Sequence, residues 1–159
     1  MRIEIFGARG TRPAARRRGS VYGGHTPCAL VRAGSGETII VDAGTGLHRL
    51  EESLPSGPNA PAELHLLLTH FHFDHLQGLP FFQALYRRRG RVVFYSAEPP
   101  AVLRGRLSGF MTGPYFPVEF SETTARKAYR RIGPKPVDIG SVRVKSCPLN
   151  HPQGSVAYR

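Results

Sequence analysis

The chain of 159 residues is 40% hydrophobic and 21% charged, the balance of an ordinary globular protein, so a single domain with a buried core is expected. No apolar run approaches membrane-spanning length and the first residues alternate like a strand, so we expect neither a transmembrane helix nor a signal peptide. The formal net charge of +11 comes mostly from arginine. This charge fits a phosphate-bearing or nucleic-acid partner, and it fits equally a solvated basic surface.

The two cysteines, Cys28 and Cys147, are predicted to be free thiols. A single disulfide is not expected in a chain without an export signal, and neither cysteine has the spacing of a metal ligand. We therefore predict a cytoplasmic protein with no membrane partner.

The first third of the chain predicts three strands, at residues 2–6, 26–31 and 37–42. Between the first two lies a long loop, residues 7–24, that is rich in glycine, proline and arginine and includes the cluster 16–18. Long irregular loops inside compact domains are often functional. This one predicts either a substrate-contacting loop or a solvated insertion.

The rest of the chain alternates strands with helices, which favours an α/β layering. Helices are predicted at 46–54, from the segment after residue 75 to about Arg88, and at 99–109; strands are predicted at 63–69, 91–96, 127–132 and 142–147, the last two joined by a turn. The aromatic segment 110–118 fits a loop that caps a pocket and equally a packed connector.

A cluster of possible metal ligands follows the predicted strand 63–69, in the order His70, His72, Asp74 and His75. Imidazole and carboxylate are the ligands that hold Zn²⁺, Mn²⁺ or Fe²⁺. An extended backbone sends His70 and His72 to one side, and the following turn lets Asp74 and His75 face a second position. One such histidine is usually an ordinary hydrogen-bonded group. Four ligands at the mouth of an apolar strand would be costly to desolvate without a cation, so we predict one or two metal ions here.

Two residues outside this cluster stay ambiguous from pattern alone. Asp42 ends a strand before Gly44 and Gly46, where it could cap a helix or orient a metal ligand. His151, by itself, would be an unremarkable loop histidine.

The motif His-x-His-x-Asp-His on a strand-to-helix loop resembles the signature of the metallo-β-lactamase superfamily. Five further segments resemble the branch that contains tRNase Z-like and cyclic-nucleotide phosphodiesterase-like hydrolases: 6–13, 22–28, 39–46, 77–82 and 115–118. The resemblance covers essentially the whole chain. It implies an αββα four-layer sandwich, of which residues 1–159 would be a single domain forming the amino-terminal half to two-thirds.

The resemblance also implies roles for individual residues. His151 would join His70 and His72 on a first zinc ion, with one tetrahedral position left for water. Asp74 and His75 would contact a second ion, and Asp42 would support the loop by accepting hydrogen bonds without being a ligand. His25 stands where the branch usually has asparagine.

The family pattern then continues with a bridging aspartate and a final histidine, and no aspartate or histidine follows His151. We therefore expect a chain that is carboxy-terminally incomplete, or one that pairs as a homo-oligomer, since half of this fold would leave an apolar sheet face in water.

The function expected from these features is metal-assisted hydrolysis, with Asp74 as the catalytic residue that orients the attacking water. The basic surface and the branch resembled favour a phosphodiester, in a small molecule or in RNA. An ester, lactone or lactam is the alternative substrate class. A third possibility is an incomplete domain that serves as an anion-binding or association module.

Overall fold

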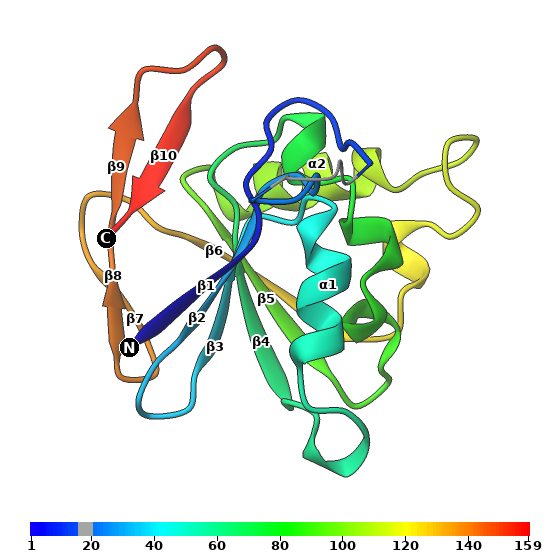
Figure 1. Ribbon diagram of the computed structural model, residues 1–159, viewed down its shortest axis with the longest axis horizontal. Helices are drawn as coiled ribbons and strands as arrows, with labels where there is room; N and C mark the ends of the chain where they lie inside the picture. Colours follow the sequence, from blue (N-terminus) through cyan, green and yellow to red (C-terminus); the bar gives the residue numbers. More distant parts are fainter. Residues whose placement is uncertain (16–20) are drawn as a thin grey trace.

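The computed structural model describes residues 1–15 and 21–159, so the arginine cluster at 16–18 lies outside the described residues. At its centre is one six-stranded sheet whose strands lie side by side in chain order (Figure 1). These strands are β1 (Arg2–Gly7), β2 (Cys28–Arg32), β3 (Thr38–Val41), β4 (Glu63–Leu67), β5 (Arg91–Ser96) and β6 (Arg126–Arg131). The expected α/β class is confirmed.

The sheet is antiparallel from β1 to β3 and parallel from β3 to β6. The connections between parallel strands carry helix α1 (Gly46–Ser53) after β3, a series of 3₁₀ turns after β4, and helix α2 (Pro100–Phe110) after β5. The carboxyl ends of parallel strands meet at one edge of a sheet. The loops that follow β3, β4 and β5 are therefore brought together there, which is where ligand sites are usual in α/β sheets.

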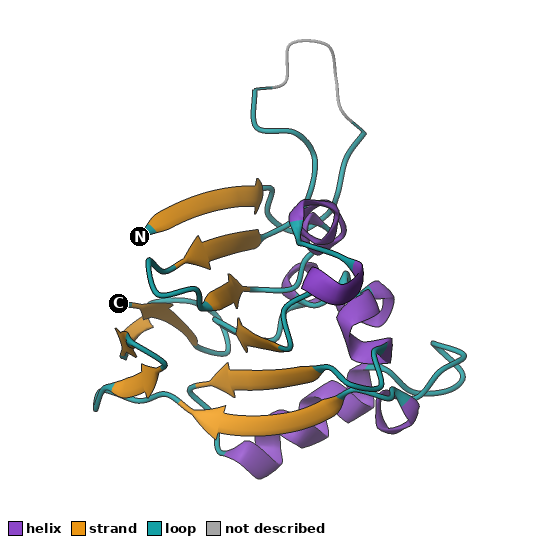
Figure 2. Ribbon diagram, turned by 90° about the horizontal axis from the view of Figure 1, so that it is seen from below, coloured by secondary structure: helices purple, strands orange, loops and turns teal. Residues whose placement is uncertain are grey.

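Side chains alternate between the two faces of the sheet, and each face has its own core. On one face, Leu30, Ile40, Leu66 and Phe94 pack beneath the helices in the larger core. On the other, the β4 and β5 residues Leu67, Val93 and Tyr95 belong to a smaller core. Figures 1 and 2 show the helices gathered on a single side of the strands.

The smaller core is covered by two hairpins, which pair β7 (Val137–Ile139) with β8 (Val142–Val144) and β9 (Ser146–Leu149) with β10 (Ser155–Tyr158). These cover the middle of the face, while Ile3 and Ile5 on the edge strand β1 are 57% and 65% exposed. The apolar face expected from the family comparison is thus partly covered and partly open.

The prediction of a helix after the histidine motif is wrong. A first 3₁₀ turn, η2 (Phe73–His75), lies within the motif, and two more, η3 (Leu79–Phe81) and η4 (Gln83–Tyr86), take the place of the helix. Pro80 lacks a backbone donor, which disfavours a continuous helix. Gly78 lies so close to Gly44 that an added Cβ would sit 2.2 Å from the carbonyl oxygen of Gly44. The turns therefore bury the same apolar side chains while keeping the segment pressed against the turn after β3.

The strand predicted at 142–147 is also different in the structure. It is divided into β8 and β9, and β7 lies between it and the strand predicted at 127–132. Gly140, at φ +55°, closes the β7–β8 hairpin. The prediction had only a turn where β7 lies. The other predicted elements lie within about two residues of their predicted bounds, whereas β10 was not predicted.

The cysteines and the lengths of the helices can be compared with their predictions. Cys28 is buried and Cys147 is exposed, and both are free, as predicted. In residues 1–15 and 21–159, no helix has the length and apolar character needed to span a membrane.

Candidate metal centre

Three imidazoles from two distant parts of the chain meet at the carboxyl edge of the sheet. His70 and His72 lie on the loop after β4, and His151 lies in the turn between β9 and β10. Each offers one ring nitrogen to a cluster in which these atoms all lie within 4.8 Å of one another. The Val156 backbone N–H donates to the Thr69 carbonyl at 3.1 Å, which fixes the β9–β10 hairpin against the loop.

The spacing of these nitrogens suits a bound cation. His151 Nε2 lies 3.2 Å from His72 Nδ1. Two nitrogens on a tetrahedral zinc, each bonded at about 2.0–2.1 Å, lie about 3.3 Å apart. The donor set of three imidazoles is also that of catalytic zinc sites, which keep their fourth position open. The residues present therefore fit a divalent ion.

Hydrogen bonds around His70 determine which of its nitrogens can face an ion. The Thr69 hydroxyl has one proton and donates it to Asp42, at 2.8 Å from Oδ2. It must therefore accept from Nδ1–H of His70, 3.0 Å away, which leaves Nε2 of His70 with its lone pair. Burial, followed by the nearby His75, lowers the pKa of His70 to about 4, so the ring is neutral at pH 7.

Asp42 joins the loop to the end of β3. It is 4% exposed and its backbone is left-handed, at φ +61°. Its carboxylate accepts three hydrogen bonds, from the backbone N–H and hydroxyl of Thr69 and from Nδ1 of His75, each at 2.8 Å. Asp42 lies outside the cluster of three imidazoles and holds the loop that carries two of them.

Asp74 and His75 lie beside the cluster rather than in it. The His70 and His75 ring centres are 4.0 Å apart, and His75 Nε2 is 3.7 Å from Asp74 Oδ2. Burial acts against protonation of His75, but the hydrogen bond and charge of Asp42, with the charge of Asp74, outweigh it and raise the pKa of His75. Asp74 Oδ2 also accepts from the Thr11 N–H at 2.7 Å, which ties the amino-terminal loop to the site.

The loop is also held by close backbone contact with the turn after β3. The Ala43 N–H donates to the His75 carbonyl at 2.8 Å, and the Gly78 N–H donates to the Ala43 carbonyl at 2.9 Å. Gly44 is packed so tightly that a Cβ there would lie 2.4 Å from the Asp74 carbonyl oxygen. The glycines of this turn therefore set the position of the histidine motif.

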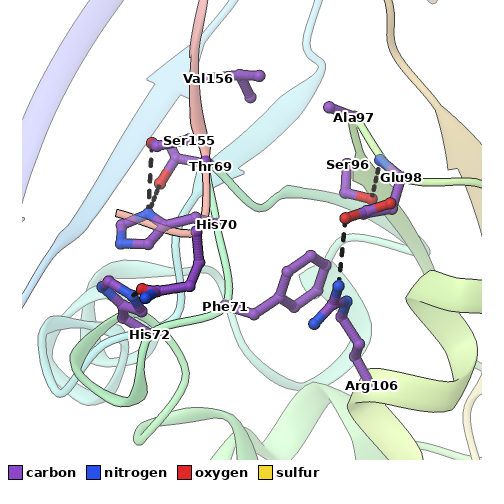
Figure 3. A pocket seen from close by; sticks show the side chains of 12 residues that line it. Thr69, His70, Phe71, His72, Ser96, Ala97, Glu98, Arg106, Ser155 and Val156 are labelled. Carbon is purple, nitrogen blue, oxygen red and sulfur yellow. Dashed lines mark hydrogen bonds and ion pairs between the residues drawn. The ribbon is translucent and has the colours of Figure 1, made fainter. Parts of the chain in front are cut away.

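A cleft of about 450 Å³ opens next to His70 and His72 (Figure 3). Arg106 of α2 stands on the wall across from the histidines, with its guanidinium 4.9 Å from the ring centre of Phe71. One Arg106 nitrogen donates to Glu98 at 3.3 Å. The cleft thus combines a side that carries two of the clustered histidines with a wall that carries a cation and an apolar ring.

Sequence reasoning missed several residues of this site. Thr69, Arg106, Ser155 and Gln153 all line the cleft, and Gln153 Oε1 lies 2.8 Å from His72 Nε2. The one local signal was the turn pattern Pro-Gln-Gly after His151.

His25 points to Thr45, with Nδ1 3.3 Å from its hydroxyl.

The aromatic segment 110–118 has the character of a packed connector. Met111 is fully buried and Phe110 packs on Phe73 at a ring separation of 5.7 Å, as a connector would. Tyr115 is 84% exposed. The segment 110–118 contributes no residue to the lining of the cleft.

The metallo-β-lactamase superfamily matches residues 21–92, which hold β2, β3, β4 and the histidine motif. Over these residues the chain is similar in sequence to this superfamily. A curated relative, the acyl-coenzyme A thioesterase MBLAC2 of Gallus gallus, is 39% identical over 83 residues, which are 48% of this chain and 27% of that protein.

Several solved structures share the fold over nearly the whole chain. A diphosphatase of the PhnP family superposes with a TM-score of 0.67 and 18% identity, covering 99% of this chain and 61% of that one. YhfI from Bacillus subtilis gives a TM-score of 0.67 with 19% identity, and covers 99% and 57%. Human tRNase Z, short form, gives 0.65 with 18% identity, and covers 98% and 62%. The chain therefore spans less than two thirds of the length of these three proteins.

Proposed function

We propose that this chain carries the metal centre of a metal-dependent hydrolase, with His70, His72 and His151 as the ligands of a first divalent ion. The supporting observation is the meeting of three imidazoles at the edge of a cleft. Zinc is the ion that this donor set favours, and Mn²⁺ or Fe²⁺ would also be accepted. When bound, the ion supplies the Lewis acidity that activates water as a nucleophile near neutral pH.

Asp74 is the residue proposed to act on that water. Its Oδ2 is engaged by the Thr11 N–H, so Oδ1 is the oxygen that can accept a hydrogen bond from the nucleophile and hold its proton. His75 and Asp74 would also contact a second ion, whose remaining ligands would have to come from outside the described residues. Asp42 keeps His75 and Thr69 in place by accepting their hydrogen bonds.

A phosphodiester is the proposed substrate class. Arg106 offers a delocalised cation on the cleft wall, and guanidinium groups suit phosphate oxygens. The net charge of +11 would raise the local concentration of anions, in a small molecule or in RNA. The fold is shared with a tRNase Z and with a diphosphatase, which is consistent with this class.

A second candidate is hydrolysis of an acyl bond, in an ester, thioester, lactone or lactam. The observation that favours it is the 39% identity to a thioesterase over 83 residues. The same ligands and the same Asp74 would serve, because an acyl carbon and a phosphorus centre are both attacked by activated water.

Turnover of two substrates separates these candidates. We expect the purified chain with Zn²⁺ or Mn²⁺ to hydrolyse bis(p-nitrophenyl) phosphate faster than p-nitrophenyl acetate, after each rate is divided by the uncatalysed rate. His72→Ala should lose activity and metal, whereas His48→Ala should not, because His48 is an exposed residue of α1. Turnover that persists in excess chelator would contradict the metal mechanism. Stoichiometric metal without turnover of either substrate would favour an anion-binding or association module.

A further inference from the structure

Gln153 occupies a backbone position that glutamine rarely takes. It is the third residue of the turn His151–Gly154, in which the Gly154 N–H donates to the His151 carbonyl at 3.0 Å. Pro152 restricts φ of the second position to negative values, and φ of Gln153 is +58°. This combination is a type II turn, whose third position favours glycine or asparagine. A strained residue of this kind beside a site is a reason to look for a role of its side chain.

The Gln153 side chain contacts a proposed metal ligand. Its Oε1 lies 2.8 Å from Nε2 of His72. An amide oxygen only accepts hydrogen bonds, so Nε2 of His72 carries a proton. In the neutral ring, the other nitrogen, Nδ1, then keeps its lone pair, and that nitrogen faces His151 Nε2 at 3.2 Å.

The same arrangement recurs at the other histidines of the loop. Thr69 accepts from Nδ1 of His70, and Asp42 accepts from Nδ1 of His75, so in each case one nitrogen is held by the protein. Gln153 completes this pattern for His72. It comes from the same turn as His151, so one short segment supplies both a ligand and the group that orients a neighbouring ligand.

We propose that Gln153 is a positioning residue, which keeps His72 in the Nε2–H tautomer and turns its Nδ1 toward the ion. The inference rests on the proposed metal centre and adds to it a specific partner for His72. Groups that orient ligating histidines typically change metal affinity about 10- to 100-fold when they are removed.

The turn itself supplies a discriminating variant. Gln153→Gly places the favoured residue at the left-handed position, so a purely structural role for this residue predicts equal or higher thermal stability and unchanged zinc binding. A positioning role predicts equal or higher stability with zinc affinity weakened about 10- to 100-fold. Gln153→Glu retains an oxygen acceptor at the same reach and should stay close to the wild type. Zinc affinity would be measured by competition with a chromogenic chelator.

A second measurement does not depend on metal. Long-range ¹H–¹⁵N NMR spectra of the zinc-free, histidine-labelled protein report which nitrogen of His72 is protonated. We expect Nε2–H in the wild type and in Gln153→Glu, and a loss of that preference in Gln153→Gly. Nδ1–H in the wild type, or equal zinc affinity in the wild type and Gln153→Gly, would overturn the role of Gln153. A wild type that has Nε2–H but binds no zinc would instead overturn the proposed metal centre.

Discussion

Asp42 and His75 are 33 positions apart and share a hydrogen bond of 2.8 Å between Oδ2 and Nδ1. The same carboxylate takes two hydrogen bonds from Thr69, so one buried side chain joins the end of β3 to both ends of the histidine motif. The motif is therefore positioned by a residue that comes from a different strand.

Asp42→Asn should weaken both the fold and the proposed metal site. Asparagine tolerates the left-handed backbone at φ +61°, so the substitution tests the carboxylate and not the backbone. Its amide has one oxygen where the carboxylate has two, so at least one buried donor loses its acceptor, which costs about 1–3 kcal/mol of unfolding free energy. Urea denaturation of the zinc-free protein measures this change. A variant as stable as the wild type would show that Asp42 does not hold the loop.

Gly44→Ala should displace the histidine motif. The added methyl would lie 2.4 Å from the Asp74 carbonyl oxygen and 2.5 Å from the Thr26 hydroxyl, so the loop must shift, at a cost of about 1–3 kcal/mol. The matched control is Gly105→Ala in α2, where nothing lies within 4 Å of the new methyl and helix propensity favours alanine by about 1 kcal/mol. Thermal unfolding should therefore shift in opposite directions for the two variants. A similar shift for both would argue against the tight packing at Gly44.

The two cysteines should react at very different rates. Burial, with the nearby charge of Asp42, raises the pKa of Cys28, whereas Cys147 is exposed on β9. The thiolate is the reactive form, so iodoacetamide at pH 8 should label Cys147 and leave Cys28 unmodified in the folded protein. Mass spectrometry of the peptides reads this out, with the urea-unfolded protein, labelled at both positions, as the control. Labelling of Cys28 at the rate of Cys147 would contradict its burial.

The strands of the six-stranded sheet were predictable because each is a short β-rich run bounded by turn residues, and the structure moves their bounds by two residues at most. The hairpin strands β7 and β10 were not predicted. The conformation of the segment from Leu76 to Leu85 was not predictable in this way. Its apolar spacing is shared by a helix and by successive 3₁₀ turns, and the choice between them depends on the contact of Gly78 with Gly44, which lies far away in sequence. Local pattern alone does not contain that contact.

The residues of the site were likewise predictable only in part. His70 and His72 stand out in the sequence because a strand end brings them together locally. His151 required the family resemblance, since its partners are about 80 residues away. Arg106 and Gln153 had no such signal, because their proximity to the histidines follows from how α2 and the β9–β10 turn are placed in three dimensions.

Acid should remove the contribution of Glu37 to stability. Hydrogen bonds from Ser35 and Ser141 lower the pKa of this carboxyl from 4.5 to about 2. A carboxyl with a depressed folded-state pKa stabilises the protein above its unfolded-state pKa and loses that contribution as the pH falls through the folded-state value. The stability difference between the wild type and Glu37→Gln should therefore be constant from pH 7 to about pH 5 and disappear near pH 2. Equal differences at pH 7 and pH 2 would show that charge is not involved.

Arg106 should distinguish an anionic from a neutral substrate. If it binds phosphate oxygens in the cleft, Arg106→Gln removes a charged hydrogen bond of about 1.5–3 kcal/mol and should raise KM for bis(p-nitrophenyl) phosphate about tenfold or more. Turnover of the neutral p-nitrophenyl acetate should hardly change. Arg104→Gln, which removes the same charge from an exposed position of the same helix outside the cleft lining, is the control.

Glu98→Gln extends this test in the opposite direction. Glu98 pairs with Arg106 at 3.3 Å, and both side chains are partly exposed, so the pair itself is weak and Glu98 competes with a bound anion for the guanidinium. Removing its charge should lower KM for the phosphodiester, and combining it with Arg106→Gln should abolish that gain because the competed group is absent. Steady-state kinetics of the two single variants and the double variant measure the coupling. If Glu98→Gln improves the phosphodiester KM even when Arg106 is glutamine, the effect comes from general charge and the cleft wall has no specific phosphate contact.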